Sequence, residues 1–269
     1  MLVGAVQSTV CTDRLSPTRM ELAMGNTKPR TVILVHGAWT DGSCWSSVIA
    51  QLNGAAVETT AVQLPLSSLA EDVATVQRAM ALEEGPLLLV GHSYGGVVIT
   101  QAGDDPKIAG LVYVAAFAPD ADQSALSLAE LLPPSPAASE LERDGSGFFK
   151  LTRKGILEDF AQDLIIGQKE VMIATQGPIS IHALGAPVSS TAWRGRSCWY
   201  VLAENDRTIW PALQERMSSH IGAETIRVPA GHVAMLSCPQ KVAEVILLAT
   251  AATLSRKRCE HMPSKGSRP

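Results

Sequence analysis

The sequence lacks three features that would each indicate a particular class of protein. It has no excess of positive charge, since 22 Lys and Arg stand against 26 Asp and Glu for a net charge of −4, and this argues against a nucleic-acid-binding protein. Its longest apolar runs, PLLLV and LVYVAAFAP, are far shorter than the ~20 residues that span a bilayer, so no membrane span is expected. Its five cysteines form no CxxC pair and no metal-like spacing with histidine, which predicts reduced thiols, no metal site and a cytoplasmic location.

The two ends of the chain also lack structural signals. The start, MLVGAVQSTVCTDRL, has no basic region and too short an apolar stretch for a secretory signal. We therefore predict a loosely ordered leader over residues 1–29, and leave open whether Met20 or Met24 is the natural start. The end, SRKRCEHMPSKGSRP, is basic and rich in Pro, Gly and Ser, so a flexible tail is expected over residues 256–269.

Between these ends, short apolar runs alternate with stretches of helical spacing. The runs predict strands at 31–37, 56–64, 86–93, 108–116, 197–206 and 223–232. The helical stretches are 43–54, 68–83, 95–104, 210–221 and 239–254, and Ser68 with Glu71 three residues on indicates a helix start. Such alternation is typical of an α/β fold in which a mostly parallel sheet of about six strands has helices on both faces.

The alternation breaks once. From 119 to 190 the strand pattern disappears, and prolines interrupt short helical pieces. We expect a small, mostly helical cap over 119–190, inserted into a core made of 30–118 and 191–255. Its apolar side chains are expected to cover an apolar pocket, although packing within the cap is the simpler role for most of them; they are Phe148, Phe149, Phe160 and Leu164.

The motif GHSYG at residues 91–95 lies between a predicted strand and a predicted helix. This is the context of a nucleophile elbow, in which a sharp turn exposes the serine and leaves room only for small residues two positions before and after it. The helix start that follows favours developing negative charge. Ser93 is therefore the predicted nucleophile.

Serine needs a base, and the base needs a carboxylate to orient it. His232 follows the last predicted strand, where a loop brings it over the elbow, and the other histidines are assigned to pocket shaping, packing or solvent: His36, His92, His182, His220 and His261. Asp206 follows the fifth strand, and Glu204 is its rival. The order Ser93, Asp206, His232 is the order of the α/β-hydrolase triad.

An acyl-transfer site also needs donors for an oxyanion. We predict the backbone N–H groups of Tyr94, after the serine, and of Ala38, in the loop after the first strand. Trp39, Trp210 and Met235 are candidates for the border of the substrate pocket, with plain packing as the alternative.

These motifs together resemble the serine α/β-hydrolases, and more narrowly the small esterases related to plant methylesterases and hydroxynitrile lyases. The resemblance is carried by VILVHGAWTDGSCW, VGHSYGG, AWRGRSCWYVLAENDRTIWP and VPAGHVAMLSCP, within roughly residues 31–240. It implies the α/β-hydrolase fold, the triad named above and no cofactor. The plant lyases carry threonine at the position of Gly37 and lysine at that of Val233, so their chemistry is not expected here.

The expected function is hydrolysis of a small to medium, largely apolar carboxylic ester through a covalent acyl-enzyme. The partner would be the small-molecule ester, with a homodimer possible. Alternatives remain open: a small-molecule receptor on the same scaffold, or a thioesterase, lactonase, acyltransferase or lyase-like activity. The sequence does not name the ester, the oligomer or the pathway.

Overall fold

A computed structural model describes residues 31–260, with side-chain surroundings for 31–253. Its main sheet has six parallel strands in the order β2-β1-β3-β4-β8-β9. The strands are β1 (Thr31–Val35), β2 (Glu58–Ala61), β3 (Leu87–His92), β4 (Ile108–Val114), β8 (Ser197–Ala203) and β9 (Glu224–Val228). All six predicted strands are present, and each ends earlier than its apolar run. The last residues of the runs form loops at the carboxyl edge of the sheet.

The predicted helices are also present: α2 (Ser46–Gly54), α3 (Leu69–Ala81), α4 (Gly95–Ala102), α9 (Pro211–His220) and α11 (Pro239–Glu260). A short 3-10 turn, Gly42–Trp45, precedes α2, and α10 (Ala234–Ser237) precedes α11. The Ser68 hydroxyl accepts the Glu71 N–H at the start of α3, as predicted. The helix α11 extends through residues 256–260, which belong to the predicted tail. Residues 261–269 and the predicted leader 1–29 lie outside the described residues.

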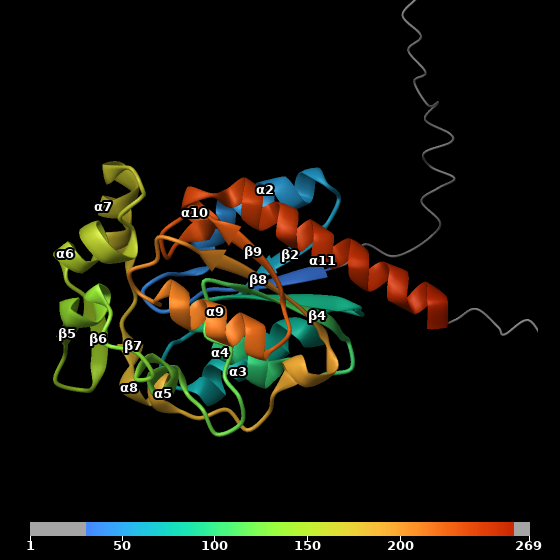
Figure 1. Cartoon of the computed structure of the whole chain (residues 1–269), viewed down its shortest axis with the longest axis horizontal. Helices are drawn as coiled ribbons and strands as arrows, with labels where there is room; N and C mark the ends of the chain where they lie inside the picture. Colours follow the sequence, from blue (N-terminus) through green and yellow to red (C-terminus); the bar gives the residue numbers. More distant parts are fainter. Residues whose placement is uncertain (1–30, 261–269) are drawn as a thin grey trace, which may run out of the picture.

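The strand order determines which helices cover which face. Connections between parallel strands are right-handed, so their direction across the sheet decides the face on which the connecting helix lies. The helix α2 connects β1 to β2, toward one edge of the sheet, whereas α3 connects β2 to β3 and α4 connects β3 to β4, toward the other edge. Thus α2 lies on the opposite face from α3 and α4. On its own face α2 packs against α11, while α3 packs against α4 (Figure 1). Because both faces are covered, β1 and β3 are buried along their whole length.

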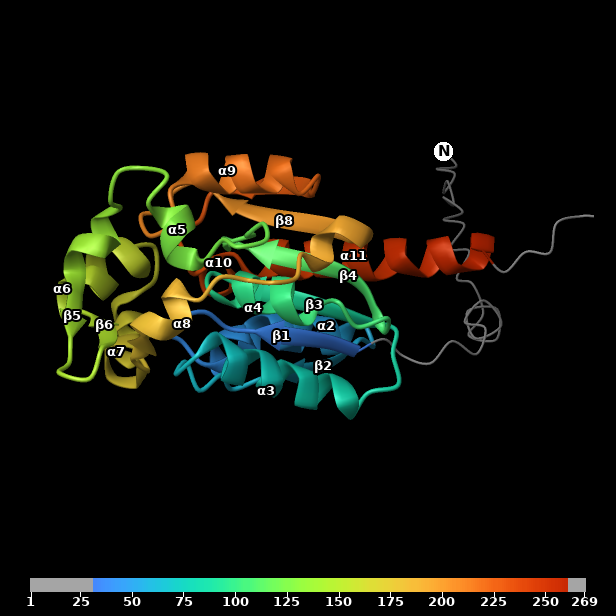
Figure 2. The same ribbon diagram turned by 90° about the horizontal axis from the view of Figure 1, so that it is seen from below.

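The segment between β4 and β8 lies beyond the carboxyl ends of the strands, and the β8 arrow points toward it in Figure 2. It contains short helices and turns at Ala125–Ala129 (α5), Pro136–Glu140, Arg153–Gly155 (α6), Ile156–Phe160, Ile166–Thr175 (α7), Ile181–Gly185 (α8) and Ala192–Gly195. It also contains an antiparallel sheet of β5 (Leu141–Arg143), β6 (Phe148–Leu151) and β7 (Ile179–Ser180). The sequence analysis missed this sheet, because strands of two to four residues leave no measurable alternation.

Two further expectations concern the described part of the chain. No helix within residues 31–260 is long and apolar enough to cross a membrane. Cys44, Cys198 and Cys238 are free thiols.

Candidate active site

The site begins at the end of β3, where the chain turns sharply into α4. Ser93 lies in the turn with φ = 53°, a left-handed backbone conformation that is rare for a residue with a side chain. A Cβ on Gly91 would lie 2.5 Å from the Gly95 carbonyl oxygen, and a Cβ on Gly95 would lie 2.6 Å from that of Val35. Side chains at these two positions would therefore prevent the turn that presents Ser93.

The structure brings Ser93, His232 and Asp206 together from three loops at the carboxyl edge. The Ser93 hydroxyl lies 2.9 Å from His232 Nε2, and His232 Nδ1 lies 2.8 Å from Asp206 Oδ2. All three residues are buried. Since the carboxylate can only accept, Nδ1 carries the proton, which leaves Nε2 free to accept the Ser93 proton. Glu204, the rival of Asp206, is exposed beyond the end of β8.

Four donors surround the Asp206 carboxylate. The Thr208 and Ile209 N–H groups donate to Oδ1 at 2.7 and 2.9 Å. Gln214 Nε2 donates to Oδ2 at 2.7 Å, beside the bond from His232. Together with His232 Nδ1, these donors hold the carboxylate in place beside the imidazole. The sequence analysis missed Gln214, since a glutamine within a helix matches no motif.

The predicted oxyanion donors lie on either side of Ser93. Ala38 and Tyr94 both line the cavity that Ser93 opens into. Within residues 31–260, neither of their N–H groups donates to a protein acceptor. A Cβ on Gly37, the residue before Ala38, would lie 2.7 Å from Ser93 Cβ. The loop after β1 therefore approaches the serine closely because residue 37 has no side chain.

A buried carboxylate holds the side chain of Tyr94. The Tyr94 hydroxyl donates to Asp72 Oδ2, and the Leu66 N–H donates to Asp72 Oδ1, each at 2.8 Å. Burial is the main cause that raises the pKa of Asp72 to about 6, and the Tyr94 hydrogen bond opposes it. No motif in the sequence pointed to Asp72.

Two further histidines lie near the site and bond backbone groups rather than Ser93. His36 Nδ1 donates to the Gly37 carbonyl and Nε2 accepts the Leu64 N–H, so one neutral tautomer satisfies both bonds. His92 Nε2 lies 3.0 Å from the His232 carbonyl oxygen, and burial holds the pKa of His92 well below its usual range.

The cap contacts both loops that carry the acid and the base. Asp159 accepts a 2.7 Å bond from Arg207, the residue after Asp206. Asp163 accepts a 2.6 Å bond from the N–H of Gly231, the residue before His232. These bonds fix the two loops to one cap segment, residues 159–163. The sequence analysis did not predict them, because they join positions far apart in the chain.

A cavity of about 120 Å³ lies beside Ser93, under the cap. Its cap wall is mostly apolar and consists of Ala125, Leu126, Ala129, Ser135, Ala137, Ala138, Leu141 and Leu184. The four apolar cap residues named from the sequence do not line it. Phe160 instead packs against Trp39 and the His232 ring, with ring centroids 5.7 and 5.1 Å apart.

The three candidate pocket residues have different positions. Trp39 lines the cavity beside Ser93. Trp210 does not; its side chain bonds the Pro133 carbonyl and borders a separate surface hollow, because Pro211 starts α9 and turns the chain away. Met235 does not either, since α10 places it wholly within the core. The positions of these residues in the sequence did not indicate the direction in which their side chains point.

The chain matches the model of the alpha/beta hydrolase family over residues 32–245 and belongs to that family. A carbendazim-hydrolysing esterase of Nocardioides sp. is 26% identical over 79% of this chain and 96% of its own length. Methylesterase 7 of Arabidopsis thaliana is 31% identical over 36% of this chain and 44% of its own. The crystal structure of polyneuridine aldehyde esterase shares the fold, with a TM-score of 0.73 at 19% identity over 83% of this chain and 100% of that one. The predicted fold class and the resemblance to the esterase group that includes plant methylesterases are thus confirmed, and the chain belongs with enzymes that act on ester bonds.

Proposed function

We propose that this protein is a serine carboxylesterase that hydrolyses a largely apolar ester through an acyl-enzyme. The observation that carries the proposal is the continuous hydrogen-bonded series from Ser93 through His232 to Asp206. The series opens on an apolar cavity, and the relatives named above are esterases.

Catalysis begins when Ser93 Oγ attacks the ester carbonyl carbon and its proton passes to His232 Nε2. The Asp206 carboxylate stabilises the imidazolium that forms. The Ala38 and Tyr94 N–H groups donate to the oxyanion, each contributing about 3 kcal/mol of transition-state stabilisation, as single donors do in other enzymes.

The tetrahedral intermediate collapses when the bond between carbon and the alcohol oxygen breaks. His232 Nε2 donates its proton to that oxygen, and the alcohol leaves. Water then attacks the acyl-enzyme and gives a proton to His232 Nε2. When the bond between the acyl carbon and Ser93 Oγ breaks, His232 returns that proton to Oγ and the acid leaves.

Two features favour hydrolysis over cyanohydrin cleavage. The lyases that the sequence resembles have threonine at the position of Gly37, and here a Cβ at that position would collide with Ser93 Cβ. They have lysine at the position of Val233, and here that side chain is fully buried. Neither a hydroxyl nor an ammonium group is available at these positions.

The test is covalent labelling with a fluorophosphonate, followed by peptide mapping and kinetics on methyl butyrate. We expect the adduct at Ser93, and a loss of kcat on the order of 10⁴-fold or more in Ser93→Ala. Ser47→Ala is the matched control, because Ser47 is an exposed residue of α2 remote from the site. An adduct at another residue, or full activity in Ser93→Ala, would refute the proposal.

A further inference from the structure

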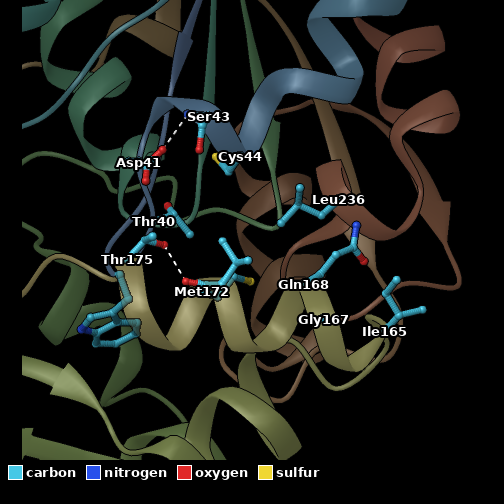
Figure 3. Close-up of a pocket in the computed structure, with 12 residues that line it drawn as sticks. Thr40, Asp41, Ser43, Cys44, Ile165, Gly167, Gln168, Met172, Thr175 and Leu236 are labelled. Atoms are coloured by element: carbon cyan, nitrogen blue, oxygen red, sulfur yellow. Dashed lines mark hydrogen bonds between the residues drawn. The ribbon is translucent and has the colours of Figure 1, made fainter.

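A second, larger cavity of about 350 Å³ lies beside the one at Ser93. Its walls are the segment Thr40–Cys44 on one side and α7 on the other, and Leu236 of α10 also lines it (Figure 3). In Figure 3, Met172 and Thr175 extend from α7 toward the Thr40–Cys44 segment. None of the residues that carry the proposed chemistry lines this cavity.

The inner walls suit an apolar ligand. Met172 and Cys44 are buried side chains, and burial raises the pKa of the Cys44 thiol so far that it stays protonated. The cysteine is thus a small apolar wall residue and not a nucleophile. Asp41 is engaged locally, because its Oδ1 accepts the Ser43 N–H at 2.7 Å.

Trp39 is a residue that this cavity shares with the cavity at Ser93. It lines both cavities, so they are one side chain apart. Its indole N–H donates to the Phe149 carbonyl of the cap at 3.1 Å. Its ring packs edge-on against Phe160, which in turn contacts the His232 ring. The indole is therefore held in place where it borders both cavities, on the side of the site where Phe160 contacts the His232 ring.

The volumes of the two cavities indicate that they bind two parts of one ligand. Ligand pockets usually have volumes of about 300–1,000 Å³. The cavity at Ser93, about 120 Å³, is below that range and has room only for a small group. The second cavity, about 350 Å³, lies within the range but contains no reactive group.

We propose that the second cavity is the alcohol subsite: it binds the apolar alcohol part of an ester whose smaller acyl part lies beside Ser93. This inference rests on the proposed esterase function. The substrates are thus esters of bulky, apolar alcohols with short carboxylic acids.

The assignment of the two halves follows from the proton transfer. The leaving oxygen takes its proton from His232 Nε2, so the alcohol must extend to the His232 side of the serine. The second cavity borders α10, which begins two residues after His232, and it borders Trp39. Trp39 also borders the cavity at Ser93, but none of that cavity's lining residues comes from α10; they include Tyr94 and Phe117, next to the nucleophile and the end of β4.

The test fills the cavity from α7 and compares two series of esters. Val171→Trp adds bulk at an exposed lining residue, and Gly167→Leu adds it where a Cβ meets no other atom. Ala174→Trp is the matched control, since Ala174 is exposed on the same helix but does not line the cavity. One series holds butyrate constant with methyl, benzyl and 2-naphthylmethyl alcohols; the other holds methanol constant with acetate, butyrate and hexanoate.

We expect wild type to prefer the larger alcohols. Both filling variants should lower kcat/KM for 2-naphthylmethyl butyrate about tenfold relative to methyl butyrate, mainly through KM. The methyl ester series and Ala174→Trp should be unaffected.

Three results would overturn the inference while Ser93-dependent hydrolysis of methyl butyrate persists. These are unchanged alcohol selectivity, a change in acyl selectivity instead, or a dimer that dissociates in Val171→Trp with selectivity intact, which would assign the cavity to a second copy. No hydrolysis of any ester by wild type would overturn the proposed function as well.

Discussion

Replacement of Asp72 by asparagine should change how the stability of the protein depends on pH. The Asp72 carboxylate is fully buried on α3 and accepts hydrogen bonds from Leu66 and Tyr94. An asparagine keeps an oxygen that can accept the Leu66 N–H, but it does not ionise. The comparison therefore isolates the ionisation of one buried group.

The magnitude follows from the pKa. Burial raises the pKa of Asp72 from 3.8 to about 6, so folding opposes ionisation. A carboxyl with a raised pKa contributes stability below the unfolded value, and that stability is lost as pH rises through the folded value. At 1.36 kcal/mol per pH unit, the whole shift corresponds to about 3 kcal/mol, of which about 2 kcal/mol is lost between pH 4 and pH 6, because the unfolded carboxyl is already half ionised at pH 4 and the folded one only half ionised at pH 6.

The assay is urea unfolding of wild type and Asp72→Asn at several pH values from 4 to 7. We expect the free energy of unfolding of the variant, relative to wild type, to rise by about 2 kcal/mol between pH 4 and pH 6. Glu58→Gln is the control, because Glu58 is an exposed carboxylate at the start of β2. A difference between wild type and Asp72→Asn that is the same at pH 4 and pH 7 would refute the reasoning.

Two further predictions test how the site is held. Asp163→Asn weakens the charged hydrogen bond to the Gly231 N–H. In steady-state kinetics, kcat for methyl butyrate should fall about fivefold, which corresponds to about 1 kcal/mol of lost transition-state stabilisation, with KM little changed. An unchanged kcat would contradict this prediction. Gly96→Ala places a Cβ 2.1 Å from the Phe117 carbonyl oxygen, so thermal unfolding should show that the free energy of unfolding falls by about 3 kcal/mol or more. Gly167→Ala, whose Cβ has no neighbouring atom within contact distance, should leave the free energy of unfolding unchanged. Equal melting temperatures for the two glycine variants would refute the second prediction.

The strands and helices of the core could be predicted from the sequence because their signals are local. Apolar runs such as 86–93 mark strands buried on both faces, and Ser68 with Glu71 marks a helix start. The cap could not be predicted to the same depth. The strands β5 and β7 have three and two residues, and they form only because a partner strand lies beside them.

The candidate site divides in the same way. Ser93, Asp206 and His232 each follow a predicted strand. Because the carboxyl ends of parallel strands lie at one edge of the sheet, the order of these residues in the chain was enough to propose that they lie together. Gln214, Asp72 and Asp163 carry no motif. Each acts through a bond to a residue distant in the chain, and such bonds exist only after the layers pack.

By itself, the sequence determined the α/β architecture and the identity of the proposed nucleophile, acid and base, because periodicity and strand-end motifs are properties of short segments. Only the tertiary structure decided that Trp39 stands between two cavities while Met235 is in the core. Cavities form where packing between cap and core is incomplete, and no single segment encodes that space.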